Sequence, residues 1–261
     1  MRLAARRIAP GRGEGTALVH PAPFSFVGGV DMATGRLSDA ASTGAGERLH
    51  GRIFGFPYGK GSTVGSYALY ALARCGLAPS AIVNERAESI VATGAILGDV
   101  PLVDRVDLGA FSTGDRVIVD ADRGHVSLPD VVERPVVSAF LRNRDRFLVV
   151  RRSDRVGSFQ GRWSAVSGYL EGRESPRHRA LQEIREETGV RGARFRRAAD
   201  PLYTRDGTTA FRVHPFLFDV PSRKVRLDWE NREYRWIRAD ELANLNTVPR
   251  LGDVLDRLLH G

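Results

Sequence analysis

The chain has 261 residues, of which 42% are apolar and 27% are charged, and its formal net charge is +8. This composition excludes a disordered chain, a collagen and a coiled-coil rod, and no apolar run reaches the ~18 residues of a membrane helix. The single cysteine, Cys75, excludes an internal disulfide, a zinc site and an iron–sulfur cluster held by this chain alone. Met1 to Arg12 are basic without an apolar segment, so we expect no signal peptide, no membrane contact and a cytoplasmic protein.

The charge is distributed unevenly along the chain. The first 133 residues carry 13 basic and 14 acidic side chains, whereas the remainder carry 26 basic and 17 acidic ones. The second half is therefore net positive, which favours an anionic ligand. Because no nucleic-acid-binding motif is present, we expect a phosphorylated small molecule and no nucleic acid. An arginine-rich genomic composition explains the same bias equally well.

The amino-acid composition changes near residue 130, which predicts two domains. Leu128, Pro129 and Asp130 form a break, and Pro135 is not expected inside a central strand. We therefore place a first domain at residues 1–131 and a second at residues 132–261. Both have the alternation of strands and helices that is typical of the α/β class.

Short strands and turns make up the first half. A glycine-rich turn is predicted at Gly11–Gly15, and a helix from about Ser66 to Arg74 is closed by Gly76. The predicted strands are Thr16–Val19, Phe24–Gly28, Arg52–Phe56, Ala81–Asn84, a strand after Pro101–Val103 and, as the last one, Gly114–Ala121.

A loop rich in glycine and hydroxyl groups lies between the strand Arg52–Phe56 and the helix that follows. Its sequence is Pro57-Tyr58-Gly59-Lys60-Gly61-Ser62-Thr63-Val64-Gly65-Ser66. Consecutive backbone amides beside a helix N-terminus can bind an anion. The candidate phosphate- or substrate-binding residues are Gly61, Ser62, Thr63, Gly65 and Ser66. The alternative is a tight strand-to-helix turn capped by hydroxyl groups.

The first half resembles the small, swivelling domain of the aconitase X family. The stretches that carry the resemblance are Gly11–Gly15, Phe26–Asp31, Gly59–Tyr67, Asn84–Glu88, Gly94–Ile96 and Pro101–Asp104. The resemblance implies that Ser62 is the proton acceptor of a dehydratase, with phosphomevalonate as the expected substrate in a variant mevalonate route to isoprenoids. It also implies a heterodimer with an aconitase X-type large subunit, which holds the iron–sulfur cluster. A scaffold that has lost its partner is the alternative.

Strands also precede the one long helix of the second half. That helix is predicted to begin after Ser175 with Pro176 in its first turn, to reach about Thr188 and to stop at Gly189. The predicted strands are Val136–Arg142, Phe147–Arg151, Trp163–Val166 and Tyr234–Ile237, and an amphipathic helix is predicted at about Val248 to Leu259.

Three carboxylates crowd one side of the long helix. Glu183 and Glu187 are one turn apart, and Glu186 lies beside them. Hard oxygen ligands suit Mg²⁺ or Mn²⁺, which also bind phosphate oxygens. The alternative is a solvated acidic face that Arg179 and Arg185 neutralise.

The spacing around these carboxylates is specific. Gly168 is followed after five residues by Glu174, and seven residues later the chain reads Gln182-Glu183-Ile184-Arg185-Glu186-Glu187-Thr188-Gly189-Val190. This resembles the Nudix box, Gly-x5-Glu-x7-Arg-Glu-U-x-Glu-Glu-x-Gly-U, where U is a bulky aliphatic residue. Only Gln182 departs from it, because the family has arginine there.

The Nudix resemblance implies an α/β/α sandwich that hydrolyses a phosphoanhydride with the help of Mg²⁺ or Mn²⁺. It implies that Glu183, Glu186 and Glu187 bind the metal, that Glu187 is also a possible base, and that Glu174 braces the loop or lies in the outer shell. Because Gln182 brings no charge, we expect weakened hydrolysis unless Arg179 or Arg185 substitutes for the missing arginine.

Other residues of the second half are less informative. Trp163 is expected in the core. Glu230 and Glu233 are expected as charges at the rim of the site, with a further metal-site carboxylate as the alternative. Four arginines are candidates for holding substrate phosphates or are simple surface charges: Arg151, Arg152, Arg162 and Arg173.

The two resemblances together predict a bifunctional fusion. The hydrolase substrate is then a nucleoside diphosphate-linked compound or an isoprenoid diphosphate. The alternative is a second domain that senses a phosphorylated metabolite without catalysis and regulates the dehydratase.

Overall fold

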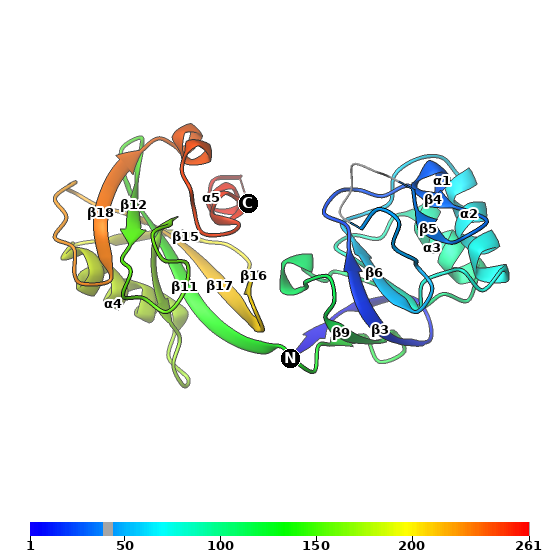
Figure 1. Cartoon of the computed structure of the whole chain (residues 1–261). Helices are drawn as coiled ribbons and strands as arrows, with labels where there is room; N and C mark the ends of the chain where they lie inside the picture. The colour runs from blue at the N-terminus through cyan, green and yellow to red at the C-terminus, as the bar shows by residue number, and fades with distance from the viewer. Residues whose placement is uncertain (39–43, 261) are drawn as a thin grey trace. The chain divides into compact units, whose positions relative to one another are not determined.

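The computed structural model describes residues 1–38 and 44–260 and divides into two compact units, Met1–Val132 and Glu133–Gly261 (Figure 1). Gly261, the last residue of the predicted second domain, lies outside the described residues. Each unit contains one eight-stranded sheet. Among the described residues, no helix combines the length and the apolar character needed to cross a membrane.

The sheet of the first unit mixes parallel and antiparallel pairs. Its strand order is β1-β10-β9-β3-β6-β7-β8-β2. Each neighbouring pair in the series β3, β6, β7 and β8 is parallel. Its strands are β1 (Arg2–Ala4), β2 (Arg6–Ala9), β3 (Arg12–Val19), β6 (Arg52–Phe56), β7 (Ala81–Asn84), β8 (Leu102–Asp104), β9 (Arg116–Asp120) and β10 (His125–Ser127). The other elements are α1 (Phe26–Gly29), the pair β4 (Val30–Asp31) and β5 (Arg36–Leu37), α2 (Val64–Arg74), α3 (Ser89–Leu97) and η1 (Leu108–Ala110).

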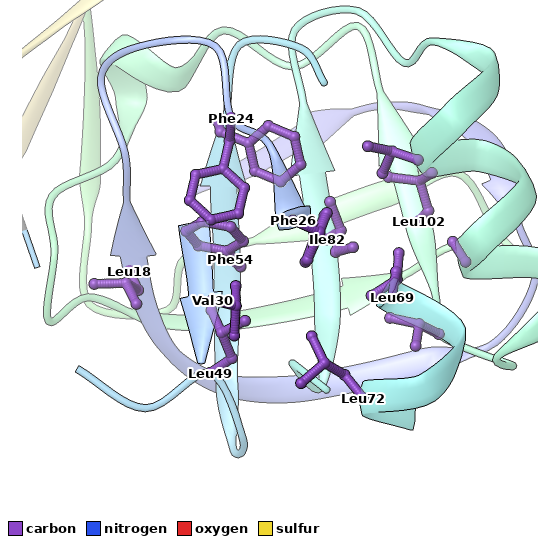
Figure 2. Packing of buried hydrophobic residues seen from close by; sticks show 14 of the residues in the cluster. Leu18, Phe24, Phe26, Val30, Leu49, Phe54, Leu69, Leu72, Ile82 and Leu102 are labelled. Carbon is purple, nitrogen blue, oxygen red and sulfur yellow. The ribbon is translucent and has the colours of Figure 1, made fainter. Parts of the chain in front are cut away.

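Helices α2 and α3 pack against the parallel strands to form the core of this unit. Leu69 and Leu72 of α2 belong to one buried cluster with Phe54 of β6 and Ile82 of β7 (Figure 2). The ring of Phe24 meets that of Phe54 edge to face, with 4.8 Å between centroids. Burying each such side chain stabilises the fold by roughly 1.5–3 kcal/mol, which fixes the position of the loop between β6 and α2.

All but the first residue of the stretch Gly11–Gly15 belong to β3, so the prediction of a turn there is wrong. A Cβ atom on Gly13 would lie 2.2 Å from the carbonyl oxygen of Ser80, and one on Gly15 would lie 2.3 Å from that of Gly51. The glycines are present because other backbone segments approach the strand closely, which is a second use of glycine besides turning the chain.

Two further expectations for the first unit are corrected. Phe24–Gly28 is not a strand, because the chain turns through α1, where Gly28 has a φ of +78°. The predicted strand Gly114–Ala121 corresponds to β9, but it is not the last one. β10 follows it and pairs with both β9 and β1.

The second unit is a sheet covered by a helix on each face. The central order is β13-β12-β11-β17-β15, with β14 beside β11, β16 beside β17 and β18 beside β12. The strands are β11 (Val132–Asn143), β12 (Arg146–Arg152), β13 (Trp163–Ser164), β14 (Val166–Tyr169), β15 (Arg194–Ala198), β16 (Leu202–Asp206), β17 (Thr209–Asp219) and β18 (Asn231–Ile237). The helices are α4 (Pro176–Thr188), η2 (Ala239–Asn244) and α5 (Leu251–His260).

Alternation along the strands produces the two apolar layers. Ala139 and Leu141 of β11 pack in one cluster with Ile184 of α4, whereas Phe140 between them packs in the other cluster with Leu255 of α5. This period of two places a core on each face of the sheet. The α/β/α sandwich that the sequence predicts is confirmed, and Trp163 lies in the α5 layer as expected.

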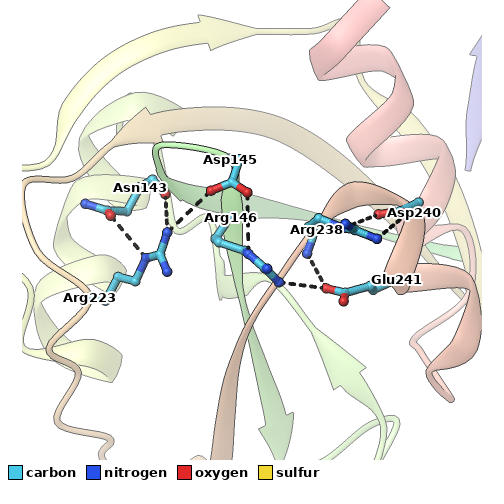
Figure 3. Close-up of polar contacts among 7 residues, drawn as sticks. All are labelled: Asn143, Asp145, Arg146, Arg223, Arg238, Asp240 and Glu241. Atoms are coloured by element: carbon cyan, nitrogen blue, oxygen red, sulfur yellow. Dashed lines mark hydrogen bonds and ion pairs between the residues drawn. The ribbon is translucent and has the colours of Figure 1, made fainter.

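A polar network holds the β11–β12 hairpin turn to the connections around it (Figure 3). Arg223 donates to the side-chain oxygen of Asn143 at 3.1 Å and contacts Asp145, while Arg146 donates to Glu241 of η2 at 3.1 Å. Exposed pairs of this kind each contribute little, typically about 0–1 kcal/mol, so their effect is to fix the loop geometry.

Pro135 lies inside β11, which contradicts the expectation that it would not occupy a strand. Its ladder to β14 begins one residue later, with Val136 opposite Tyr169. The carbonyl group of Pro135 accepts a hydrogen bond from the amide of Leu170 at 3.0 Å, so proline serves here as an acceptor only.

Candidate functional site

Helix α4 fixes the carboxylates of the second unit. Ser175 is its N-cap residue and Pro176 its first residue, and Gly189 ends it with a φ of +64°. Ala180 and Ile184 are fully buried against the sheet, which sets the rotation of the helix. Glu183 and Glu187 consequently lie on the inner side.

Glu187 is the most buried carboxylate of the site, with 2% of its surface exposed. One carboxylate oxygen accepts the amide N–H of Ser167 at 3.0 Å, and the other accepts the side-chain amide of Asn231 at 2.6 Å. Burial raises the pKa of Glu187 well above its ordinary value, and the charges of Glu183 and Glu230 raise it further, against the effect of both hydrogen bonds.

Glu183 lies one turn before Glu187 and is also buried. Burial raises its pKa to about 7; the ion pair with Arg179 opposes this shift, and the charges of Glu186 and Glu230 add to it. A Cβ atom on Gly168 of β14 would lie 1.8 Å from the Glu183 carboxylate oxygen. The glycine is therefore required so that this carboxylate can lie directly against the strand.

Two more glutamates complete the cluster. Glu186 is exposed and accepts a hydrogen bond from Gln182 at 2.9 Å. Glu230, expected at the rim, is half-buried beside the others: burial and Asp228 raise its pKa, and Glu186 adds to the shift. The segment before it is tied to α4 by the amide of Asp228, which donates to the carbonyl group of Glu187 at 3.2 Å.

Glu174 lies apart from this cluster. Its carboxylate accepts the amide N–H of Glu171 at 2.7 Å, and both residues belong to the loop that precedes α4. Gly189 ends the helix at the opposite end. These two positions of the box pattern therefore shape the loop and the helix end, while the carboxylate cluster lies between them.

The donor chemistry of the cluster fits a divalent cation. The four glutamates, Glu183, Glu186, Glu187 and Glu230, offer hard oxygens, and burial, together with the charges of neighbouring carboxylates, raises the pKa values of three of them. Within residues 1–38 and 44–260, however, no three His, Cys, Asp or Glu side chains converge as a metal-binding group. Both oxygens of Glu187 are instead engaged by Ser167 and Asn231.

A cavity of about 280 Å³ lies beside the cluster. Its walls are mainly apolar and aromatic, with Phe159, Tyr169 and Phe211 among them, and Glu183 and Glu230 line it as well. The residues that line it come from β11, β12, β13, β14, β16, β17, α4, α5 and the loops between them.

Two hydroxyl groups on the cavity wall lack partners. The side-chain oxygens of Ser164 and Thr204 are buried and have no hydrogen-bond partner in the described part of the chain. Such a group costs about 1–3 kcal/mol when left unsatisfied, which is expected of a group that awaits a ligand.

Of the four arginines named as candidates for holding phosphates, Arg152 alone lines the cavity. Arg151 pairs with Glu233 at 3.4 Å and Arg162 donates to the carbonyl group of Thr247 at 3.3 Å, and neither lines the cavity. Arg152 and Arg155 do line it. A β-bulge between Arg151 and Arg152 shifts the strand register there, and such a bulge is not visible in the sequence.

The Ser62 loop of the first unit is built differently. The amide of Lys60 donates to the carbonyl group of Phe24 at 2.8 Å, which anchors the loop, and Gly61 has a φ of +117°. Gly61, Ser62 and Thr63 are exposed at the start of α2.

Gly65 and Ser66 point away from that surface. Ser66 is buried and donates to the carbonyl group of Ile90 at 2.8 Å, and a Cβ atom on Gly65 would lie 2.9 Å from the Ile90 side chain. These two residues join α2 to α3, so the exposed part of the loop consists of residues 60–64.

Comparison with known proteins identifies both halves. The family described as aconitase X swivel domain matches residues 2–128, and the family described as NUDIX domain matches residues 132–258. The phosphomevalonate dehydratase small subunit of Thermococcus kodakarensis is 51% identical over 128 residues, which are 49% of this chain and 96% of that protein. Its counterpart from Methanocaldococcus jannaschii is 52% identical over 128 residues, 49% of this chain and 98% of that protein. The crystal structure of a MutT protein from Methanosarcina mazei is 25% identical, covers 51% of this chain and 96% of its own, and has a TM-score of 0.44.

Proposed function

The chain belongs to the aconitase X swivel-domain family through its first half and carries a Nudix domain in its second half, and from this premise we propose a bifunctional fusion. The second half is proposed to be a hydrolase of phosphoanhydrides that depends on Mg²⁺ or Mn²⁺. The first half is proposed to be the small subunit of an aconitase X-type dehydratase that acts on phosphomevalonate.

One observation carries the hydrolase proposal: Glu183 and Glu230 line a cavity that also contains arginines, and Glu186 and Glu187 lie within electrostatic reach of both. Glu183, Glu186 and Glu187 would hold the metal, with Glu230 beside them. When bound, a divalent cation neutralises phosphate oxygens and lowers the pKa of a water molecule. Arg152 and Arg155 would bind the phosphates, since both line the cavity.

Glu187 is the proposed base. Its carboxylate is held by the amide of Ser167 and by Asn231, so its orientation is fixed before a substrate arrives. A carboxylate that is buried and oriented in this way can accept a proton from a water molecule at its oxygen atoms.

The cavity favours one class of substrate over the other. An isoprenoid chain offers no hydrogen-bonding group, so it would leave the hydroxyls of Ser164 and Thr204 buried and unpaired. A nucleoside offers donors and acceptors together with a flat ring that suits Phe159 and Phe211. We therefore assign a nucleoside diphosphate-linked substrate to the hydrolase.

The test uses the purified full chain with Mg²⁺ or Mn²⁺ and a panel of nucleoside and isoprenoid diphosphates. Release of phosphate or of a monophosphate is the expected result, with Glu187→Gln inactive. If only isoprenoid diphosphates are hydrolysed, the substrate assignment is wrong and the hydrolase assignment remains.

The relatives named phosphomevalonate dehydratase small subunit support the proposal for the first half. Ser62 is exposed on a loop whose glycine positions and packing hold it at the start of α2. We propose that Ser62 Oγ takes the proton next to the substrate carboxylate. The partner large subunit would supply the iron–sulfur cluster, because this chain has one cysteine, Cys75, which is exposed.

Co-expression with an aconitase X-type large subunit tests this half. A heterodimer with dehydratase activity on phosphomevalonate is expected, and Ser62→Ala should abolish dehydration while the heterodimer still forms. Assembly without activity in the unmodified complex would favour the scaffold alternative.

A second candidate for the Nudix half is a sensor that binds a phosphorylated metabolite without hydrolysing it. Two observations favour it: Gln182 replaces the box arginine, and the described residues contain no converged metal group. Saturable binding of a nucleotide without turnover, together with changed dehydratase activity of the heterodimer, would identify a sensor.

A further inference from the structure

The carboxylate cluster needs a positively charged side chain to compensate it. The Nudix box pattern has an arginine for this role, but in this chain a neutral residue occupies that position. Gln182 donates its side-chain amide to Glu186 on the exposed side of α4. It therefore leaves the buried carboxylate of Glu183 without a partner from that position. An isolated buried carboxylate is unfavourable unless a cation or several donors compensate it.

Arg179 is the residue that compensates it. Its guanidinium group forms an ion pair with Glu183 one turn further along the same helix. The side chains are 22% and 6% exposed respectively, so water screens this pair much less than a surface pair. Both residues also line the cavity, together with Glu230.

Two other nearby arginines make different contacts. Arg185 is exposed and lines a separate hollow with Arg191, Lys224 and Arg226. Arg152 donates to the carbonyl group of Ser158 at 3.0 Å and to the hydroxyl of Ser167 at 3.3 Å.

The position of Arg179 is unfavourable for the helix itself. It lies near the amino end of α4, where the helix dipole favours acidic residues, and the first turn of α4 contains none. Its Nε atom is buried and has no hydrogen-bond partner in the described part of the chain. The ion pair with Glu183 holds the cation in this position, and such exceptions to local rules are expected at functional sites.

We propose that Arg179 is the positioning residue of the Nudix site and replaces, from one turn upstream, the arginine that Gln182 lacks. This inference rests on the proposed hydrolase function. Arg179 holds Glu183 against Gly168 on the wall of the cavity that all three residues line. Gln182 meanwhile orients Glu186, so the two residues share the role of one arginine.

The test moves the arginine along the helix. Arg179→Ala should lower kcat by about 10–100-fold and weaken Mn²⁺ binding by a similar factor, as is usual when a partner of a metal ligand is removed. KM should change little, because the substrate contacts remain. Arg179→Lys should restore part of the activity, and the double variant Arg179→Ala/Gln182→Arg should restore most of it. Arg185→Ala is the matched control and should behave as the unmodified chain.

Mn²⁺ binding is followed by electron paramagnetic resonance, which needs no turnover. If Arg179→Ala leaves both kcat and Mn²⁺ affinity unchanged while the unmodified enzyme is active, the inference is overturned and the hydrolase assignment stands. If the double variant stays as weak as Arg179→Ala, the replacement of one position by the other is wrong.

If the unmodified chain neither binds Mn²⁺ nor hydrolyses any substrate, the proposed function fails instead. A double-mutant cycle on urea unfolding midpoints then decides about Arg179. Coupling between Arg179→Ala and Glu183→Gln would retain Arg179 as the positioning partner of Glu183, whereas additive midpoint shifts would overturn it as well.

Discussion

The Ser62 loop and the Glu187 cluster differ in how much of a site each contains. Ser62 is exposed on a loop, and its neighbours Gly65 and Ser66 serve the packing of α2 on α3. Glu187 is buried beside a cavity, with hydrogen-bond partners for both of its oxygens. We propose that a site of the first kind is completed by a partner, whereas a site of the second kind draws its residues from one chain. We therefore expect the two activities to be separable by single substitutions.

A substitution in each site, with both activities measured, gives the largest expected effects. Glu187→Gln should lower hydrolysis by about 10²–10⁴-fold, the range usual for loss of a general base, and should leave dehydration by the heterodimer unchanged. Ser62→Ala should show the reverse pattern. Both activities are measured on the same preparation of the heterodimer. A loss of both activities in either variant would contradict the independence of the two sites.

Glycine substitutions sharpen the contrast between a site and a packing contact. Gly168→Ala should cost about 1–3 kcal/mol of stability by overpacking and should also remove most hydrolysis, because the new Cβ displaces the Glu183 carboxylate. The control is Gly94→Ala in α3, whose Cβ would lie 2.8 Å from the carbonyl oxygen of Ser66. That variant should be destabilised similarly while hydrolysis is retained. Urea unfolding and phosphate release measure the two effects.

Part of this arrangement was predictable from sequence. Ser175, Pro176 and Gly189 gave the bounds of α4, and the spacing of the three glutamates placed Glu183 and Glu187 one turn apart on it. Either Arg179 or Arg185 was a candidate substitute for the missing arginine, but helical spacing favours Arg179, which lies four residues before Glu183, over Arg185, which lies two residues after it. The sequence does not show that the pair is buried, which follows from the helix rotation set by Ala180 and Ile184.

The remaining failures have a common cause in long-range contacts. The β-bulge beside Arg151 changes which arginines line the cavity. The close approach of the Ser80 and Gly51 carbonyl groups explains why two positions in the stretch predicted as a turn are glycines. Glu230 reaches the cluster through a backbone hydrogen bond from Asp228 to α4, which no local pattern encodes. Local periodicity predicts elements, whereas these contacts depend on how distant elements pack.

The unpaired hydroxyls of the cavity predict a smaller effect. Thr204→Val keeps the shape of the side chain and removes the hydroxyl group. KM for a nucleoside diphosphate substrate should rise by up to about 10-fold, the equivalent of one hydrogen bond, while kcat is retained. Stability should be unchanged or higher, since a buried unsatisfied group is lost. Steady-state kinetics check this, and an unchanged KM together with an unchanged KM for Ser164→Ala would show that neither hydroxyl contacts the substrate.

The pH dependence of stability should be opposite in the two units. In the second unit, burial raises the pKa of Glu183 to about 7, and burial also raises the pKa values of Glu187 and Glu230. These groups bind protons more tightly when folded, so metal-free stability should increase as the pH falls from about 8 to about 5.

In the first unit, burial alone would raise the pKa of Asp104. Its hydrogen bonds with Arg6 and with the amide of Ala87 outweigh that effect and hold the pKa below its ordinary value.

The stability contributed by Asp104 is therefore present at neutral pH and is lost only as the pH falls below about 4.

The three tryptophans, Trp163, Trp229 and Trp236, all lie in the second unit, so their fluorescence during urea unfolding reports on that unit within the intact chain. Hydrogen exchange of peptides from residues 1–132 reports on the other unit. Saturating Mg²⁺ should remove the gain of the second unit at low pH, because the cation favours the ionised carboxylates. A second unit that loses stability between about pH 8 and pH 5 without metal would contradict the raised pKa values of its buried glutamates.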